Sequence, residues 1–103
     1  MKASGIEVRA GRGAAPSRRE VEETLVAEGL TPHAWGNAAG YAYASHAHQD
    51  HKVLVCVRGS IVFHVAAGDV ALGPGDRMEL PGGVDHGATV GAGGVECVEA
   101  YRH

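Results

Sequence analysis

Downstream of residue 40, short apolar runs rich in valine and tyrosine alternate with turns that contain glycine. Runs of this kind are typical of β-strands. The pattern predicts strands over Tyr41–Ser45, Val53–Val57, Ile61–Val65, Val70–Leu72, Arg77–Leu80, Gly87–Val90 and Val95–Ala100. The turns recur about every 8–12 residues, as they do in antiparallel sandwiches and barrels. Because no helical pattern separates these runs, a parallel βαβ sheet is not expected.

A single helix is predicted nearer the start of the chain. Ser17 and Glu20 have the spacing of a capping box, in which each side chain bonds to the backbone N–H of the other. Val21 and Leu25 would share one face of this helix, and Gly29 suits the left-handed residue that follows the last turn. Because this apolar face is narrow, we expect the helix to pack on the outside of a larger unit or against a partner chain.

Composition narrows the class of protein. The chain has 103 residues, enough for one domain, with 45% hydrophobic residues and a formal net charge of −3. These values are typical of a globular protein and not of one that binds nucleic acid. Neither a membrane-spanning stretch nor a signal peptide is found, so we expect a cytoplasmic protein. In a reducing cytosol, Cys56 and Cys97 are expected to be small buried thiols.

Histidine is the overrepresented reactive residue, with seven copies. His46 and His48 are separated by one residue, so on an extended strand both imidazoles project from the same face. His86 follows the rigid turn Pro81-Gly82-Gly83 much later in the chain. Three neutral imidazoles can bind Fe, Mn, Ni, Zn or Cu as a divalent ion and leave positions open for water or substrate. The alternative is that these are surface histidines of a His-rich chain.

The residues around these histidines resemble the two signatures of the cupin superfamily. The first extends from Gly40 through His46, His48 and Lys52 to Gly59, and the second from Gly75 through Pro81, Gly83 and His86 to Val90. The resemblance covers roughly residues 40–100. It implies a compact antiparallel jelly-roll β-barrel, in agreement with the predicted strands.

The resemblance also implies an organisation for the whole chain. We expect an all-β cupin barrel over residues 40–103, with residues 1–39 forming an N-terminal strand and helix extension packed on it, in a single domain overall. Small cupins are commonly homodimers, and the thin core expected of a chain this short fits a homodimer. A small molecule is the expected ligand, with neither nucleic acid nor membrane as partner.

Two residues depart from the signatures. Lys52 stands where the first usually has a glutamate that completes a three-His, one-carboxylate metal site, and Val90 stands where the second usually has asparagine. A protonated lysine repels a nearby dication. Three interpretations of Lys52 stay open: it reaches solvent at the barrel mouth and pairs with Asp50 or Asp85, it orients an anionic substrate group, or it is a desolvated amine that acts as base or Schiff-base former.

Other side chains are secondary candidates. His51 could serve as gatekeeper or fourth metal ligand, although strand alternation places it on the face opposite Lys52. His64 is expected to point outward or to bond a neighbour, and His33 and His103 are expected to be peripheral. A ligand pocket or a dimer interface would use the larger side chains Trp35, Tyr41, Tyr43 and Met78.

Two main functions follow from these observations. The first is a three-His divalent-metal enzyme, of dioxygenase or isomerase type, that acts on a small anionic or dicarbonyl-like molecule, with Lys52 orienting a negative group. The second is a binding or sensing module without turnover, because the signature leaves no obvious carboxylate to act as general base. A metal-free barrel, in which the histidines have no ligand role, is the third hypothesis.

Overall fold

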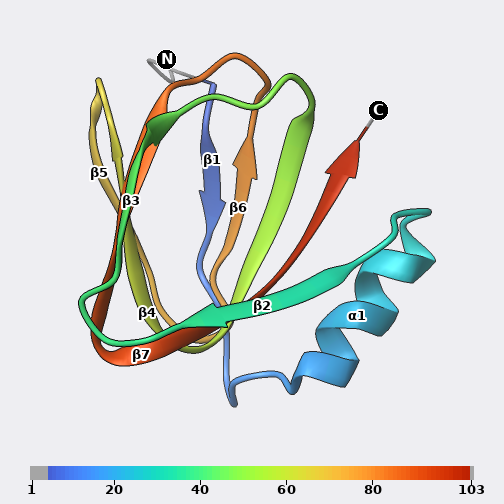
Figure 1. The fold of residues 1–103 in the computed structure, drawn as a ribbon. Coiled ribbons are helices and arrows are strands. Elements are labelled where there is room, and N and C mark those ends of the chain that lie inside the picture. The colour runs from blue at the N-terminus through green and yellow to red at the C-terminus, as the bar shows by residue number, and fades with distance from the viewer. Residues whose placement is uncertain (1–4, 103) are drawn as a thin grey trace.

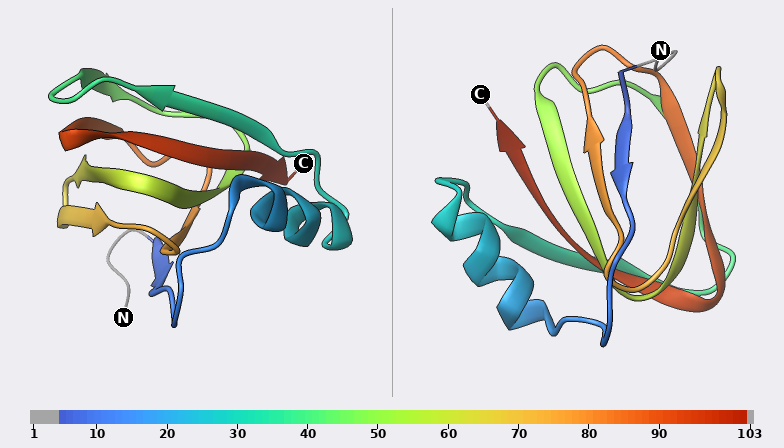
Figure 2. Two further views of the ribbon diagram at one scale, coloured as in Figure 1. Left: turned by 90° about the horizontal axis from the view of Figure 1, so that it is seen from below. Right: turned by 180° about the vertical axis from the view of Figure 1, so that it is seen from behind.

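Seven strands and one helix make up the protein, as seen in a computed structural model that describes residues 5–102 (Figure 1). In chain order the elements are β1 (Glu7–Arg9), α1 (Arg18–Ala27), β2 (His33–Asn37), β3 (Ala42–His46), β4 (His51–Val65), β5 (Gly68–Leu72), β6 (Arg77–Leu80) and β7 (His86–Arg102). All strand pairs are antiparallel, and the main sheet has the order β1-β6-β4-β7-β2. β3 also pairs with β7, and β5 with β4. The sheet curls into a jelly-roll barrel, which confirms the predicted fold class (Figure 2).

The two long strands β4 and β7 each turn a corner of the barrel without ending. Their pairing shifts register between Cys56 and Arg58 and again between Gly59 and Ile61. Because side chains alternate along a strand, such bulges exchange its two faces. Even-numbered residues of β4 therefore face inward before the corner, and odd-numbered residues face inward after it. Turns were predicted at Arg58-Gly59 and at residues 91–94, and both lie within these continuous strands instead.

The barrel encloses one apolar cluster, and a second lies on its outer face. The inner cluster comprises Leu54, Cys56, Ile61, Phe63, Leu72, Met78, Leu80, Ala88, Val90, Val95 and Cys97. Both cysteines are free and fully buried, as predicted, and they face each other across β4 and β7. The outer cluster comprises Val21, Leu25, Val53, Val55, Val57, Val98 and Ala100.

The helix α1 covers this outer cluster. Of the two positions expected from the sequence, the outside of a larger unit or the surface of a partner chain, the helix therefore takes the first. Both hydrogen bonds of the capping box are present: Glu20 N donates to Ser17 Oγ at 3.1 Å, and Ser17 N donates to Glu20 Oε1 at 2.9 Å. Val21 and Leu25 are the buried residues of the helix. Gly29 follows the last turn with a φ of 84°, a conformation that glycine adopts without strain.

Two strands of the sheet lie outside the predicted strand runs. β1 pairs with β6, and β2 pairs with β7, so the N-terminal segment supplies strands to the sheet itself. The sequence of β2, His-Ala-Trp-Gly-Asn, does not alternate between apolar and polar residues, which is why its pattern gave no strand signal. The division at residue 39 stays a prediction. Among residues 5–102, no helix has the length and apolar character needed to cross a bilayer.

Candidate metal centre

Three histidines meet at one end of the barrel. His46 on β3 and His86 on β7 are directly opposed in the sheet register, and their ring centroids lie 4.6 Å apart. His48 lies in the loop after β3, with its ring centroid 4.8 Å from that of His46 and 5.1 Å from that of His86. One ring nitrogen from each histidine lies within 4.8 Å of the others. The structure thus brings together the three residues that the sequence singled out.

Hydrogen bonds to the backbone orient two of these rings. His46 Nδ1 lies 2.8 Å from the carbonyl oxygen of Ala44, and His86 Nδ1 lies 2.9 Å from that of Val84. In each case an Nδ1–H donates to the carbonyl, so the lone pair is on Nε2. This arrangement, in which the second ring nitrogen is held by a backbone acceptor, is the usual support of a metal-bound histidine.

The surroundings favour neutral imidazoles. Burial lowers the pKa of His48 below the ordinary value, and the positive charge of Lys52 acts in the same direction. Burial also lowers the pKa of His86, although its hydrogen bond to the carbonyl of Val84 opposes this. Only a neutral imidazole has a lone pair for a cation. Both residues are therefore in the ligand form at neutral pH, and the donor set fits a first-row transition metal ion.

A cavity of about 390 Å³ opens beside the three histidines. It is lined by His33, Ala34, Trp35, Asn37, Tyr43, His46, His48, Lys52, Ile61, Phe63, His86, Ala88, Glu99 and Tyr101. One wall is aromatic. The rings of Trp35 and Tyr43 pack edge to face with their centroids 5.8 Å apart, and the Asn37 amide donates to the Tyr43 hydroxyl. Such a cavity, mostly apolar with a few polar groups, is typical of a small-molecule site.

This lining changes several predictions. His33 was expected to be peripheral and instead lies on the cavity wall, at an exposed position of β2. Trp35 and Tyr43 line the pocket, whereas Met78 is a fully buried core residue. Tyr41 is exposed and packs against the ring of Tyr43 at 4.8 Å. His103 lies outside the described residues.

Lys52 is buried and pairs with Glu99, which contradicts the first of the three interpretations, in which it reaches solvent at the barrel mouth. Its Nζ lies 3.3 Å from Glu99 Oε1, and the exposed fractions of the two side chains are 9% and 17%. The ammonium also lies 5.7 Å from the centroid of the Tyr101 ring. Sequence reasoning missed Glu99, although two-residue alternation along β7 places it on the inner face with Cys97 and Tyr101.

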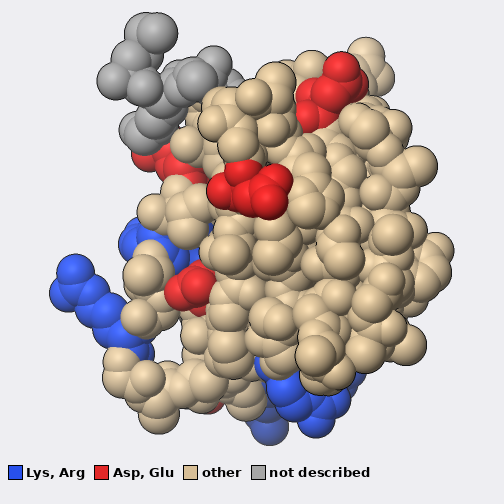
Figure 3. All heavy atoms as spheres, turned by 90° about the vertical axis from the view of Figure 1, so that its left-hand side faces the viewer, with Lys and Arg blue, Asp and Glu red and all other residues tan. Residues whose placement is uncertain are grey.

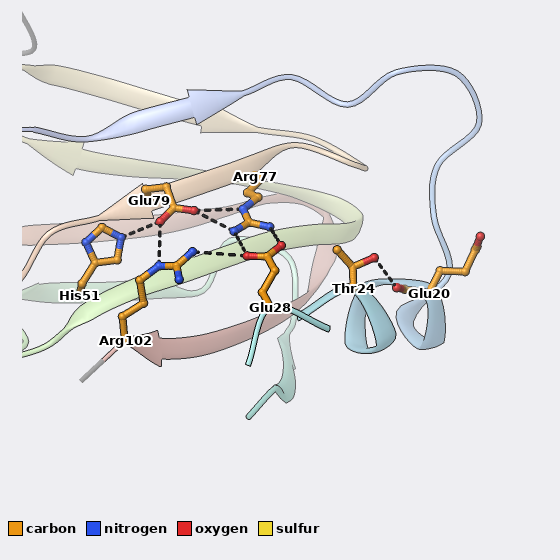
Figure 4. A network of polar contacts seen from close by, with 7 residues as sticks. All are labelled: Glu20, Thr24, Glu28, His51, Arg77, Glu79 and Arg102. Carbon is orange, nitrogen blue, oxygen red and sulfur yellow. Dashed lines mark hydrogen bonds and ion pairs between the residues drawn. The ribbon is translucent and has the colours of Figure 1, made fainter. Parts of the chain in front are cut away.

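His51 is not part of the cluster, which corrects the suggestion of a fourth ligand or gatekeeper. Its Nε2 lies 2.7 Å from Glu79 Oε1 on the outer face of the barrel. Glu79 belongs to a network with Arg77, Arg102 and Glu28 that ties the end of α1 to β6 and β7 (Figure 4). The strand alternation that separated His51 from Lys52 is confirmed.

His64 bonds neighbours, as predicted. His64 Nδ1 lies 2.8 Å from Asp69 Oδ1, and His64 Nε2 lies 2.8 Å from Thr89 Oγ1. All three side chains belong to exposed positions on the outside of the sheet, and none of them lines the cavity. His64 therefore joins β4 to its neighbouring strands.

Comparison with solved structures identifies the fold. A cupin superfamily protein from Desulfitobacterium hafniense superposes over 98% of this chain and 80% of its own, with a TM-score of 0.63 and 12% identity. The chain has the cupin fold. A DUF861 family protein from Thermotoga maritima is similar to this chain as well, with a TM-score of 0.66 and 12% identity over 94% of this chain and 99% of that one.

A third similar structure is a DMSP lyase from Ruegeria pomeroyi. It matches with a TM-score of 0.66 and 23% identity over 72% of this chain, and the match spans 38% of the lyase. No protein-family model and no curated protein matches the sequence. At these identities the likeness establishes the cupin fold, and the chemistry has to be argued from the cavity.

Proposed function

We propose that this cupin is a divalent-metal enzyme that acts on a small anionic or dicarbonyl-like molecule. The convergence of His46, His48 and His86 on one point carries the proposal. Three imidazoles would hold Fe, Mn, Ni, Zn or Cu and leave positions open toward the cavity. When bound, such an ion supplies a Lewis acid that polarises a carbonyl or carboxylate oxygen.

The chain's own residues would bind and orient the substrate. The ammonium of Lys52 has three N–H donors, and its pairing with Glu99 leaves others for a negative or carbonyl group in the cavity. Trp35 and Tyr43 offer flat apolar surfaces that exclude water from a planar molecule. The cavity volume of about 390 Å³ is in the range of small-molecule sites.

The alternative of a non-catalytic binding or sensing module loses its main argument. That hypothesis was motivated by the lack of a carboxylate in the signature, and the cavity contains the carboxylate of Glu99. A carboxylate within reach of a bound molecule can accept or deliver a proton. One structure of this fold is named as a lyase, which supports an enzymatic use of the cupin barrel but does not name the reaction.

Metal loading tests the proposal most directly. Purified protein is incubated with Fe(II), Mn(II), Ni(II), Zn(II) or Cu(II), and the metal retained after desalting is measured by elemental analysis. We expect one equivalent in wild type, loss of retention in His46→Ala and unchanged retention in His33→Ala, which removes another histidine of the same cavity. Trace metal in wild type under all conditions would refute the metal centre.

Turnover is then tested on the loaded protein. Oxygen uptake and product formation are followed with a panel of 1,3-diketones, 2-hydroxy acids and phenols. Conversion that disappears in His46→Ala supports the enzyme. Saturable binding of these molecules without any conversion would support the binding module instead.

A homodimer and a cytoplasmic location stay predictions. On the side of the molecule that bears β3 and β5, uncharged residues cover most of the surface, with acidic side chains scattered among them (Figure 3). Such a surface favours contact with a second copy of the chain over contact with a charged polymer. Size-exclusion chromatography with light scattering measures the mass in solution, and a mass of one chain at all concentrations would contradict the dimer.

A further inference from the structure

An ion pair with unusual placement forms part of the cavity wall. Lys52 on β4 and Glu99 on β7 come from neighbouring strands, and both side chains face the inside of the barrel. The distance of 3.3 Å between Nζ and Oε1 and the low exposure of both groups make this pair distinct from the solvated pairs on α1. Charges held this far from water are poorly screened, so each acts on its surroundings over several ångströms.

The same pair lies beside the three histidines. Both side chains line the same cavity as the histidines, and the ring centroid of Tyr101 lies 5.7 Å from Lys52 Nζ and 5.8 Å from the ring centroid of His48. A dication held by these rings would therefore experience both charges. An unpaired ammonium at this position would repel it, and the carboxylate of Glu99 offsets that repulsion.

Tyr101 completes this part of the wall. Burial raises the pKa of Tyr101, and the charge of Glu99 acts in the same direction. The hydroxyl therefore stays protonated at neutral pH. Its ring centroid lies 5.8 Å from that of His48, so the ring beside the Lys52 ammonium also borders the histidine cluster.

We propose that Glu99 is a positioning residue of the metal centre, whose carboxylate neutralises Lys52 and so allows a dication to bind beside an ammonium. The inference rests on the proposed metal centre. In this chain Lys52 stands where the first signature usually has a glutamate, and the neighbouring strand supplies a carboxylate at Glu99. Glu99 acts by offsetting the charge of Lys52 at the metal and is not one of the three ligands.

A double-mutant cycle on the full chain tests this inference. The dissociation constant for Zn(II) is measured by competition with a chelator for wild type, Glu99→Gln, Lys52→Met and the double variant. We expect the Glu99→Gln variant to bind Zn(II) about tenfold more weakly than wild type, because the ammonium of Lys52 then has no carboxylate to offset its charge. Lys52→Met should bind more tightly than wild type, because the carboxylate remains alone, and the double variant should return close to wild type.

Two controls separate this role from a structural one. Glu99→Asp keeps the charge and should retain most of the affinity, whereas a loss equal to that of Glu99→Gln would contradict the inference. Melting temperatures of the metal-free proteins report any general destabilisation. If Glu99→Gln does not fold, the comparison of Lys52→Met with the double variant still tests the inference. The double variant must bind Zn(II) more weakly than Lys52→Met, because it lacks the carboxylate.

The outcomes also distinguish this inference from the proposed function. Binding of Zn(II) with the same affinity in all four proteins, within about twofold, would overturn the role of Glu99 and leave the metal centre intact. Weaker binding in both single variants would point to a packing role and would also overturn it. No binding by wild type would overturn the metal centre, and the inference with it.

Discussion

His51 and Lys52 are consecutive residues whose side chains lie on opposite faces of β4. His51 bonds Glu79 on the outside, and Lys52 bonds Glu99 inside the barrel. Each residue joins a different polar network, one that fastens the helix α1 to the sheet and one that borders the histidine cluster. A substitution can therefore alter one network and leave the other intact, although the two networks begin at neighbouring residues.

This separation predicts different results for two histidine substitutions. His86→Ala removes a member of the cluster and should abolish metal retention, because two imidazoles bind a dication far more weakly than three. His51→Ala should leave metal retention unchanged and lower the free energy of unfolding by about 1 kcal/mol, through loss of its hydrogen bond to Glu79. Elemental analysis and denaturant unfolding measure the two effects. Loss of metal from His51→Ala would contradict the placement of this side chain.

The outer network predicts a dependence of stability on acid pH. Hydrogen bonds from Arg77 lower the pKa of Glu28, and those from His51 and Arg77 lower the pKa of Glu79 against the opposing effect of burial. A carboxyl group with a lowered pKa in the folded protein stabilises it at pH values above the ordinary pKa, near 4.5. That contribution is lost as the pH falls through the lowered value. We therefore expect the free energy of unfolding to decline below about pH 4.5.

Substitution of these glutamates supplies the control. The Glu28→Gln, Glu79→Gln double variant should be less stable than wild type at neutral pH by about 1–3 kcal/mol, since hydrogen bonds to charged groups are lost. Its decline with acid should be shallower, and each single variant should lie between the two. Urea unfolding at a series of pH values measures this. Parallel curves for wild type and double variant would refute the linkage.

The barrel corner predicts unequal effects for two glycine substitutions. Gly59 and Gly40 have φ values of 78° and 76°, so alanine is strained at both. At Gly59 an added Cβ would lie 2.0 Å from the carbonyl oxygen of Gly94, whereas at Gly40 it would meet nothing within 4 Å. Gly40→Ala should lower the free energy of unfolding by about 1–2 kcal/mol, because only backbone strain is added there. Gly59→Ala should cost clearly more, and equal losses in thermal unfolding would contradict the close approach of β4 and β7.

Two neighbours on α1 test how the helix is held. Leu25 is fully buried against the outer cluster, whereas Val26 is 59% exposed. Leu25→Ala should lower the free energy of unfolding by about 2–5 kcal/mol, because it removes buried methyl groups and leaves a cavity. Val26→Ala should change it by less than about 0.5 kcal/mol, as is usual for surface positions. Similar effects of the two substitutions would mean that α1 does not pack on the sheet as described.

Local signals predicted much of this structure. Capping-box spacing located the helix, and the β6 prediction, Arg77–Leu80, matches its bounds in the structure. Alternation along β4 placed Lys52 inside and His51 outside, and the spacing of His46, His48 and His86 singled out the residues that cluster. Each of these signals depends on residues close in sequence or on a recognised spacing.

Contacts between distant segments were harder to predict. Glu99 is 47 residues from Lys52, and nothing near either residue marks the other as its partner. The glycine-containing segments at the barrel corner have the composition of turns. In the structure, bulges let β4 and β7 continue as strands through these segments. His33 reached the cavity because β2 pairs with β7, and that pairing depends on the closure of the sheet and not on the composition of β2.

The three histidines are held to unequal degrees. His46 and His86 occupy opposed positions in a strand ladder, which fixes the separation of their backbones. His48 lies in a loop, where its carbonyl accepts one hydrogen bond from Gly83 N. A centre with two rigid donors and one adjustable donor accommodates ions of different radius, so it discriminates little by size. Cellular supply and the intrinsic preference of imidazole nitrogen would then decide which ion the proposed centre holds.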